Sequence, residues 1–115
     1  MADNVVYVDF DGGVKRVMNN AKLYVKLLTK FRNDTKLDDI ETSIAEGNLE
    51  KAKAATHTIK GVAANLSLTE LFNQSLALET QIKSGQVDPN QLETVKTVFA
   101  MTLQEVDKAV AEHGQ

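Results

Sequence analysis

The sequence predicts an all-α protein, an up-and-down antiparallel four-helix bundle with one or two short additional helices at its N-terminal end. Three observations carry this prediction. Apolar residues recur at helical spacing through most of the 115 residues, with a single extended stretch near the start. Glycines and the single proline fall mainly at junctions between the periodic stretches. The junctions are short, which makes neighbouring helices antiparallel.

Size and composition fit one domain that covers residues 1–115. Hydrophobic residues make up 43% of the chain, enough for a core without metals or disulfides. The chain has no cysteine, which excludes disulfide scaffolds, Cys-ligated zinc and thiol catalysis and fits a reducing compartment. The apolar runs are only a few residues long. We therefore expect neither a membrane span nor a signal segment, and a location in the cytoplasm.

The charge pattern disfavours nucleic acid as a partner. Thirteen basic and sixteen acidic residues give a net charge of −3. The charges are interspersed along the predicted helix faces, as on ordinary solvated helices, whereas nucleic-acid binders more often carry clustered Lys and Arg.

The N-terminal half is predicted as an arm and three helices. Residues 4–10 alternate in the manner of a strand or arm, and we favour an arm leading into a short helix near residues 13–18. A helix over 20–32 presents an inner stripe, and a helix over 36–46 ends at Gly47, a suitable residue after a helix C-terminus. The inward residues are Ala21, Leu23, Tyr24, Leu27, Leu28 and Phe31 in the first and Leu37, Ile40 and Ile44 in the second.

Three further helices follow, each with a predicted cap. Asn48 caps a helix over 49–64, Ser67 and Glu70 form a capping box for a helix over 68–83 that ends at Gly85, and Asp88 opens the last helix. Leu66 and Leu71 take the hydrophobic-staple positions, Pro89 the first helical position, and Gln91 completes a second box. The inward residues are Leu68, Leu71, Ser75, Leu78 and Ile82, then Leu92, Val95, Phe99, Leu103, Val106 and Val110.

His57 is the candidate reactive residue, since the helical wheel turns it outward. It lies about 130° from the centre of the apolar arc of its helix. That arc consists of Leu49, Ala52, Thr56, Ile59, Ala63 and Leu66. Lys53, Gly61 and Ala64 share the face of His57, and Lys60 borders it. A glycine inside a helix costs ~1 kcal/mol relative to alanine, and Gly61 would let another surface approach the ring closely. A solvated histidine and a packing glycine are the alternative interpretation.

Antiparallel geometry predicts Glu79 as the partner of His57. If the chain reverses near Leu68, Glu79 lies as far after the turn as His57 lies before it, and each directly follows an inward residue. A carboxylate on Nδ1–H would fix the tautomer and leave Nε2 as the nucleophile. A solvated carboxylate is the equally weighted alternative from geometry alone. Lys60 and Lys53 would offset phosphoryl charge, although helix solubility is the preferred interpretation for Lys53.

The segment from His57 to Leu66 resembles the signature of the histidine-containing phosphotransfer (HPt) domain family. That signature is His-x-x-Lys-Gly, then a small residue, then Asn and an aliphatic residue. The resemblance extends over about residues 9–84, including the Leu78-Glu79 pair, and the last helix matches only in type. Ser67 departs from it, because the family usually has glycine there; the predicted capping box would accommodate the serine.

The resemblance implies a phosphocarrier without independent catalytic activity, in a two-component phosphorelay. His57 would be the phosphoacceptor, Lys60 the phosphate-neighbouring cation and Glu79 its hydrogen-bond partner, with Lys53, Gly61 and Ala64 at the docking surface. The partners would be the receiver domain of a response regulator or a hybrid sensor histidine kinase. No cofactor or metal site is expected on this chain, which has no Gly-rich phosphate loop; the receiver would supply Mg²⁺ and most of the catalytic machinery.

Two alternatives belong to other classes. The chain could be the phosphoacceptor domain of a larger chemotaxis-type histidine kinase. Met1 and the polar tail at 112–115 argue against this alternative, because they lead us to expect a complete chain. It could instead be a non-catalytic helical adaptor, against which the intact set of His57, Lys60 and Gly61 argues. A monomer is expected, because each long helix has a definable polar face. The sequence names neither the cognate receiver and kinase, nor the direction of phosphate flow, nor the signal.

Overall fold

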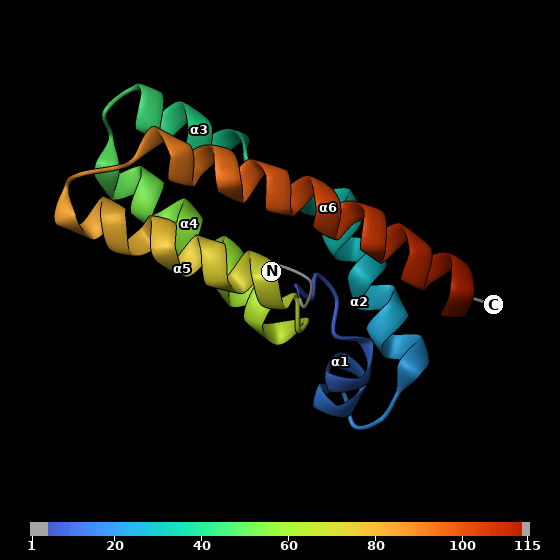
Figure 1. The fold of residues 1–115 in the computed structure, drawn as a ribbon. Coiled ribbons are helices and arrows are strands. Elements are labelled where there is room, and N and C mark those ends of the chain that lie inside the picture. Colours follow the sequence, from blue (N-terminus) through green and yellow to red (C-terminus); the bar gives the residue numbers. More distant parts are fainter. Residues whose placement is uncertain (1–4, 114–115) are drawn as a thin grey trace.

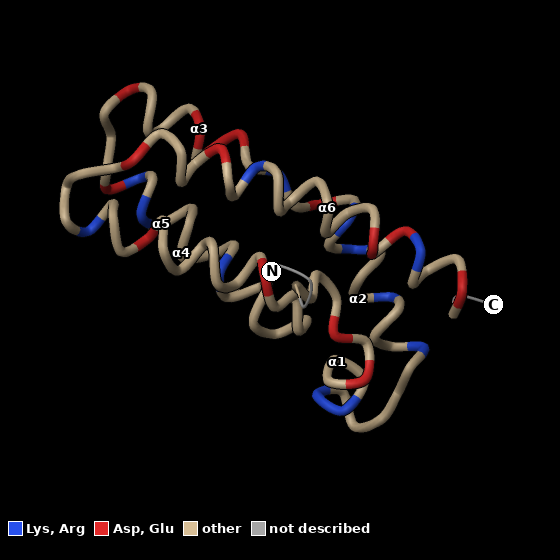
Figure 2. The backbone as a smooth tube through the Cα atoms, viewed as in Figure 1, with Lys and Arg blue, Asp and Glu red and all other residues tan. Residues whose placement is uncertain are grey.

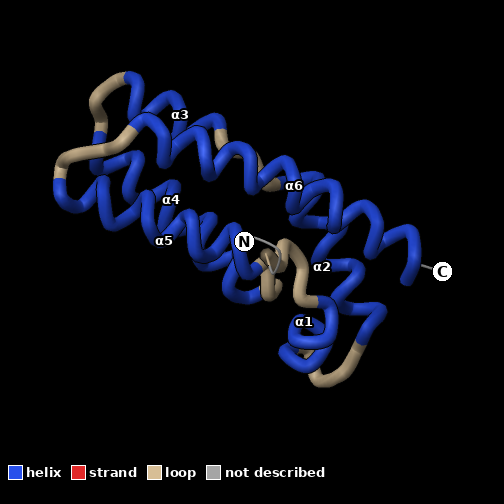
Figure 3. Tube along the Cα trace, in the orientation of Figure 1, coloured by secondary structure: helices blue, strands red, loops and turns tan. Residues whose placement is uncertain are grey.

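The computed structural model describes residues 5–113, and within them it contains helices and loops but no strand (Figures 1 and 3). The predicted all-α fold is therefore confirmed. The helices are α1 (Phe10–Arg16), α2 (Ala21–Asp34), α3 (Asp38–Ala45), α4 (Leu49–Asn65), α5 (Thr69–Ser84) and α6 (Pro89–His113).

The four long helices α2, α4, α5 and α6 form the bundle, and α1 and α3 are the short additions. Helix α4 packs against α5, α5 against α6, and α6 against α2, while α3 lies against α4 and α1 against α2. Consequently the α4–α5 pair and the α2–α6 pair form two different sides of the bundle, as Figure 1 shows. Lys/Arg and Asp/Glu are interspersed over the molecule as a whole, although α2 is mainly basic and α3 carries only acidic charges (Figure 2).

The core runs along the bundle axis, with Tyr24 near the end that α1 covers. The Tyr24 ring is fully buried, packs edge-on against Phe10, and fills the space that a side chain at Gly13 would occupy. Its hydroxyl donates a 2.6 Å hydrogen bond to the carbonyl of Leu66 at the end of α4. Burial raises the pKa of the Tyr24 hydroxyl, which keeps it a donor at neutral pH. Tyr24 thus joins α1, α2 and the α4–α5 loop.

Several predicted helix ends agree with the structure. Asn48 caps α4 as predicted, since its side chain accepts a hydrogen bond from the backbone N–H of Lys51. Asn20, predicted as the first residue of its helix, is instead the N-cap of α2 and accepts from the N–H of Leu23. Gly47 and Gly85 follow α3 and α5 with φ of 73° and 80°, the left-handed region that favours glycine. Helix α1 begins at Phe10, earlier than the predicted 13–18, because Asp9 caps it by accepting from the N–H of Gly12. Asn4, where the predicted arm begins, lies outside the described residues.

The predicted capping box at Ser67 and Glu70 is wrong. Ser67 belongs to the turn that ends α4 and has a left-handed φ of 56°, while the N-cap of α5 is Leu68, which makes no side-chain capping bond. The N–H of Glu70 instead donates to the carbonyl of Val6, and the N–H of Asp9 donates to the carbonyl of Ser67. The N-terminal segment therefore performs the capping, through a contact between distant parts of the chain that local sequence does not reveal.

The second predicted box is half correct. Asp88 caps α6, because its carboxylate accepts from the N–H of Asn90. The side chain of Gln91 does not bond the backbone N–H of Asp88, as a capping box requires. Its side-chain amide donates instead to the backbone carbonyl and the side-chain oxygen of Gln74 on α5. The N–H of Asp88 donates to the side chain of Gln81 instead.

Two predicted inner stripes are shifted. In α2, Leu23 is 40% exposed and Ala21 is exposed, whereas Val25 is buried. In α6 the buried line is displaced by a fraction of a turn from the predicted one, so that Phe99 and Leu103 are only partly buried. That buried line consists of Val95, Val98, Thr102, Val106 and Ala109. The shifts arise because α2 and α6 pack against each other, which turns Val25 inward and leaves Leu23 on the surface.

Candidate functional site

His57 lies on the outer face of α4, as the helical wheel predicts. Its side chain is 69% exposed, while Thr56 and Ile59 on either side of it face the core. The hydroxyl of Thr56 donates to the carbonyl of Ala52, so this buried polar group needs no outside partner. The helix therefore holds the imidazole at a fixed place on an open surface.

Glu79 on α5 approaches the ring from the adjacent helix. Its Oε2 lies 3.0 Å from Nδ1 of His57, and its side chain is only 4% exposed. An ionised carboxylate can only accept a hydrogen bond, so Nδ1 carries the proton and donates it. In the neutral ring, Nε2 is then left with a free lone pair. The structure thus brings together the two residues that antiparallel geometry pairs.

Lys60 contacts the same carboxylate. Its Nζ lies 2.7 Å from Oε1 of Glu79, and its side chain is 20% exposed. The hydrogen bond from Lys60, together with the one from His57, lowers the pKa of the Glu79 carboxyl below its ordinary value, although burial opposes this change. Sequence analysis paired Glu79 with His57 alone and did not predict this contact. The buried carboxylate of Glu79 therefore contacts both His57 and Lys60.

Gly61 lies one turn beyond His57 on an uncovered part of α4. A Cβ atom added at Gly61 would meet no atom within 4 Å apart from its chain neighbours and the backbone of its own helix. No packing within the described residues therefore requires a glycine here, and the interpretation of Gly61 as a helix-packing glycine loses its support. Lys53 and Ala64, on the same face, are half-buried. The surface next to His57 is therefore open at Gly61.

Lys83 is the site residue that sequence analysis missed. It is exposed, lies one turn after Glu79 on α5, and its charge also lowers the pKa of the Glu79 carboxyl. The i,i+4 spacing of Glu79 and Lys83 on one helix face was the signal in the sequence that points to it.

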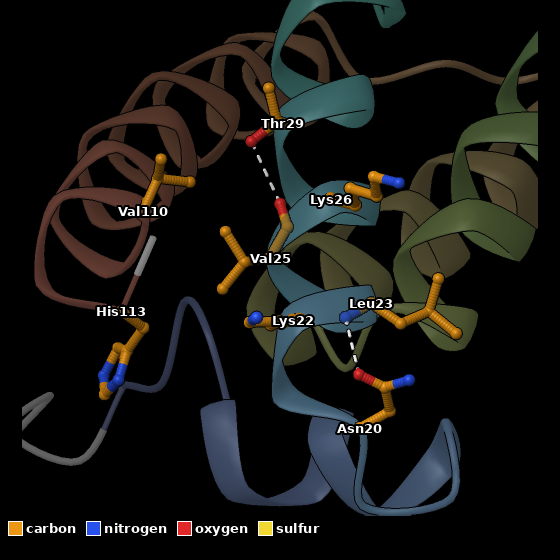
Figure 4. Close-up of a pocket in the computed structure, with 8 residues that line it drawn as sticks. All are labelled: Asn20, Lys22, Leu23, Val25, Lys26, Thr29, Val110 and His113. Carbon is orange, nitrogen blue, oxygen red and sulfur yellow. Dashed lines mark hydrogen bonds between the residues drawn. The ribbon is translucent and has the colours of Figure 1, made fainter. Parts of the chain in front are cut away.

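The larger grooves lie away from His57. One of about 690 Å³ runs between the N-terminal half of α2 and the C-terminal end of α6, with Lys22, Leu23 and Val110 among its lining residues (Figure 4). Another of about 550 Å³ lies among α1, α2 and α4 and includes Val62 and Asn65. Neither includes His57, so the imidazole is presented on an open face rather than in a pocket.

Residues 5–113 contain no group of three or more His, Cys, Asp or Glu side chains placed to hold a metal ion. They also contain no helix with the length and apolar character needed to cross a membrane.

Comparison with known families matches residues 27–111 to the Hpt domain, and the chain belongs to this family. It is similar to the phosphorelay intermediate protein YPD1 of Candida albicans, with 37% identity over 60 residues. The match spans 52% of this chain and about a third (33%) of the length of that relative. No significant match to a solved structure was found.

Proposed function

We propose that this protein is a histidine phosphotransfer protein of a two-component phosphorelay, which carries a phosphoryl group on Nε2 of His57 between receiver-domain aspartates. Membership of the Hpt family supports the class of function. The observation that carries the assignment to His57 is the hydrogen bond between its Nδ1 and Glu79, which leaves Nε2 exposed and unprotonated in the neutral ring.

The transfer step needs no proton to leave the ring. The lone pair of Nε2 attacks the phosphorus of an aspartyl phosphate; a P–N bond forms, the P–O bond to the aspartate breaks, and the aspartate leaves as a carboxylate. Nδ1 keeps its proton throughout, so the phosphorylated ring is an imidazolium, whose positive charge Glu79 offsets at 3.0 Å. In the reverse direction a neutral imidazole leaves, which makes the step reversible.

The partner completes the chemistry. Phosphoryl transfer depends on positioning and on neutralising charge over the equatorial oxygens. This chain offers the nucleophile, its positioning carboxylate and nearby lysines, and we assign Mg²⁺ binding and most of the catalysis to the receiver domain. The receiver would belong to a response regulator or a hybrid sensor kinase and would dock over His57, Gly61 and Ala64. The monomeric state and the cytoplasmic location remain predictions.

The direct test supplies a ³²P-labelled receiver domain with Mg²⁺ and follows the label onto this chain. We expect acid-labile, alkali-stable labelling of the wild type and of His113→Gln, and none of His57→Gln. His113 is the matched control, because it is the other histidine of the chain and lies at the end of α6. Persistent labelling of His57→Gln would overturn the assignment.

A further inference from the structure

The ionised side chains around His57 are not equally available to a phosphoryl group. Lys60 already forms an ion pair with Glu79 at 2.7 Å and is mostly buried. Moving it to the phosphoryl group would leave a buried carboxylate with one hydrogen-bond partner fewer, which is costly. Lys60 is therefore better described as a positioning residue that acts through Glu79.

Two other lysines occupy the next level of the same pair of helices. Lys53 lies four residues before His57 on α4, and Lys83 lies four residues after Glu79 on α5. Because α4 and α5 pack against each other in opposite directions, equal steps bring both lysines to the same level. That level is one helical turn, about 5.4 Å, from His57 and Glu79.

Neither lysine is neutralised within the described residues. No Asp or Glu oxygen lies within 4.0 Å of the ammonium group of either residue, although Glu50 is on the same face as Lys53. Lys83 is exposed and Lys53 half-buried. Two like charges at one level repel each other mildly, and a dianionic group placed beside them attracts both and more than offsets that repulsion.

We propose that Lys53 and Lys83 form a cation pair that stabilises phosphorylated His57, whereas Lys60 serves to position Glu79. This inference rests on the proposed function. It assigns the role of the cations next to the phosphoryl group to Lys53 and Lys83 instead of Lys60. The pair acts across solvent at the distance of about one turn, so each lysine contributes modestly and its contribution depends on ionic strength.

A small phosphoryl donor tests the proposal without any docking surface. Full-length wild type, Lys53→Gln, Lys83→Gln, the double variant and Lys83→Arg are incubated with phosphoramidate at low salt, and the rate of phosphohistidine formation is measured. We expect each single Gln variant to react about two- to five-fold more slowly, the double variant to combine both losses, and Lys83→Arg to match the wild type. The differences should shrink in 1 M salt, a response that a merely structural role would not give.

Lys22→Gln is the matched control, because Lys22 is an exposed lysine on α2, in the groove between α2 and α6. Rates of both single Gln variants equal to that of Lys22→Gln at low salt would overturn the inference. If the wild type itself gains no phosphate on His57, the proposed function fails instead. If the wild type forms phosphohistidine and both lysine variants react at the same rate as the wild type, the proposed function stands and only the cation pair is refuted.

Discussion

Glu79 connects His57 and Lys60 through its two carboxylate oxygens, with Oε2 3.0 Å from Nδ1 of the histidine and Oε1 2.7 Å from Nζ of the lysine. The carboxylate is almost fully buried, so both hydrogen bonds compensate for its removal from water. The His57 ring is exposed, but the carboxylate that orients it is not. Nε2 therefore stays accessible, while the hydrogen bond from Nδ1 to the buried carboxylate fixes the tautomer of the ring.

Replacing Glu79 by glutamine should slow phosphoryl transfer to His57 by about ten- to a hundred-fold. Glutamine can still accept from Nδ1–H, but it cannot offset the imidazolium charge, and a hydrogen bond to a charged group is worth ~1.5–3 kcal/mol. Single-turnover rates from a phosphorylated receiver measure the effect. Glu70→Gln is the control, because Glu70 is on the same helix and bonds Gln74 rather than His57. A wild-type rate in Glu79→Gln would refute the role of the carboxylate.

The same carboxyl predicts a pH dependence of stability. Its pKa is lower in the folded state than the ordinary value of 4.5, so the folded protein binds fewer protons than the unfolded chain between these values. The stabilisation is fully present above pH 4.5 and is lost as the pH falls through the lower folded-state value. Urea unfolding of the wild type and of Glu79→Gln between pH 7 and pH 3 measures the difference between their free energies of unfolding. That difference should be constant above pH 4.5 and shrink only below it. A constant difference would contradict the ionised, paired state.

Two substitutions at Gly61 separate stability from docking. Gly61→Ala should raise the free energy of unfolding by ~1 kcal/mol, because the site is helical and open. Gly61→Gln should leave helicity intact and still accept phosphate from phosphoramidate, but it should block transfer from a receiver domain by filling the approach surface. Circular dichroism and both labelling reactions measure this. Normal transfer from the receiver to Gly61→Gln would place the partner elsewhere.

Gly13→Ala should destabilise the bundle by ~1–3 kcal/mol, the usual cost of overpacking. The added methyl group would collide with the Tyr24 ring, which is fully buried and tied to the carbonyl of Leu66. Chemical denaturation measures the change, and Gly61→Ala, the same substitution in open space, serves as the control with the opposite sign. Equal stability of wild type and Gly13→Ala would show that α1 shifts freely from Tyr24.

Ser67→Gly should stabilise the protein by ~0.5–1 kcal/mol. Ser67 has a φ of 56°, and a non-glycine residue in the left-handed region carries a cost of ~1–2 kcal/mol that glycine avoids, less the extra entropy of glycine in the unfolded chain. Gly85→Ala, at a φ of 80°, is the converse change and should destabilise. A lower melting temperature for Ser67→Gly would indicate that the serine side chain contributes more than its strain costs.

Local sequence was sufficient for most of the fold, because its signals are short-range. Helical periodicity, the cap at Asn48 and the glycines after α3 and α5 all act within a turn or two of the residues that carry them. The capping box at Ser67 failed because the acceptor for Glu70 comes from Val6, far away in the chain. Leu23 was misplaced for a related reason, since the choice between Leu23 and Val25 depends on where α6 lies.

The site could be predicted as far as helix geometry reaches. The outward direction of His57 and its pairing with Glu79 follow from the wheel and from the antiparallel turn. The ion pair between Lys60 and Glu79 was not predicted, because a long flexible side chain at the border of a face can turn either way. Lys83 was missed because the i,i+4 spacing from Glu79 does not by itself single it out, and its place beside Lys53 depends on the packing of α4 on α5.

The exposed setting of His57 limits how selectivity and inhibition can arise. The side chain of His57 is 69% exposed, and the space beside Gly61 is open. This part of the surface therefore offers a drug-sized compound little concave area to bind. Under the proposed function, discrimination among receiver domains would then come from complementarity over a broad contact area. A compound meant to silence this chain would have to imitate that footprint or act on the visiting protein instead.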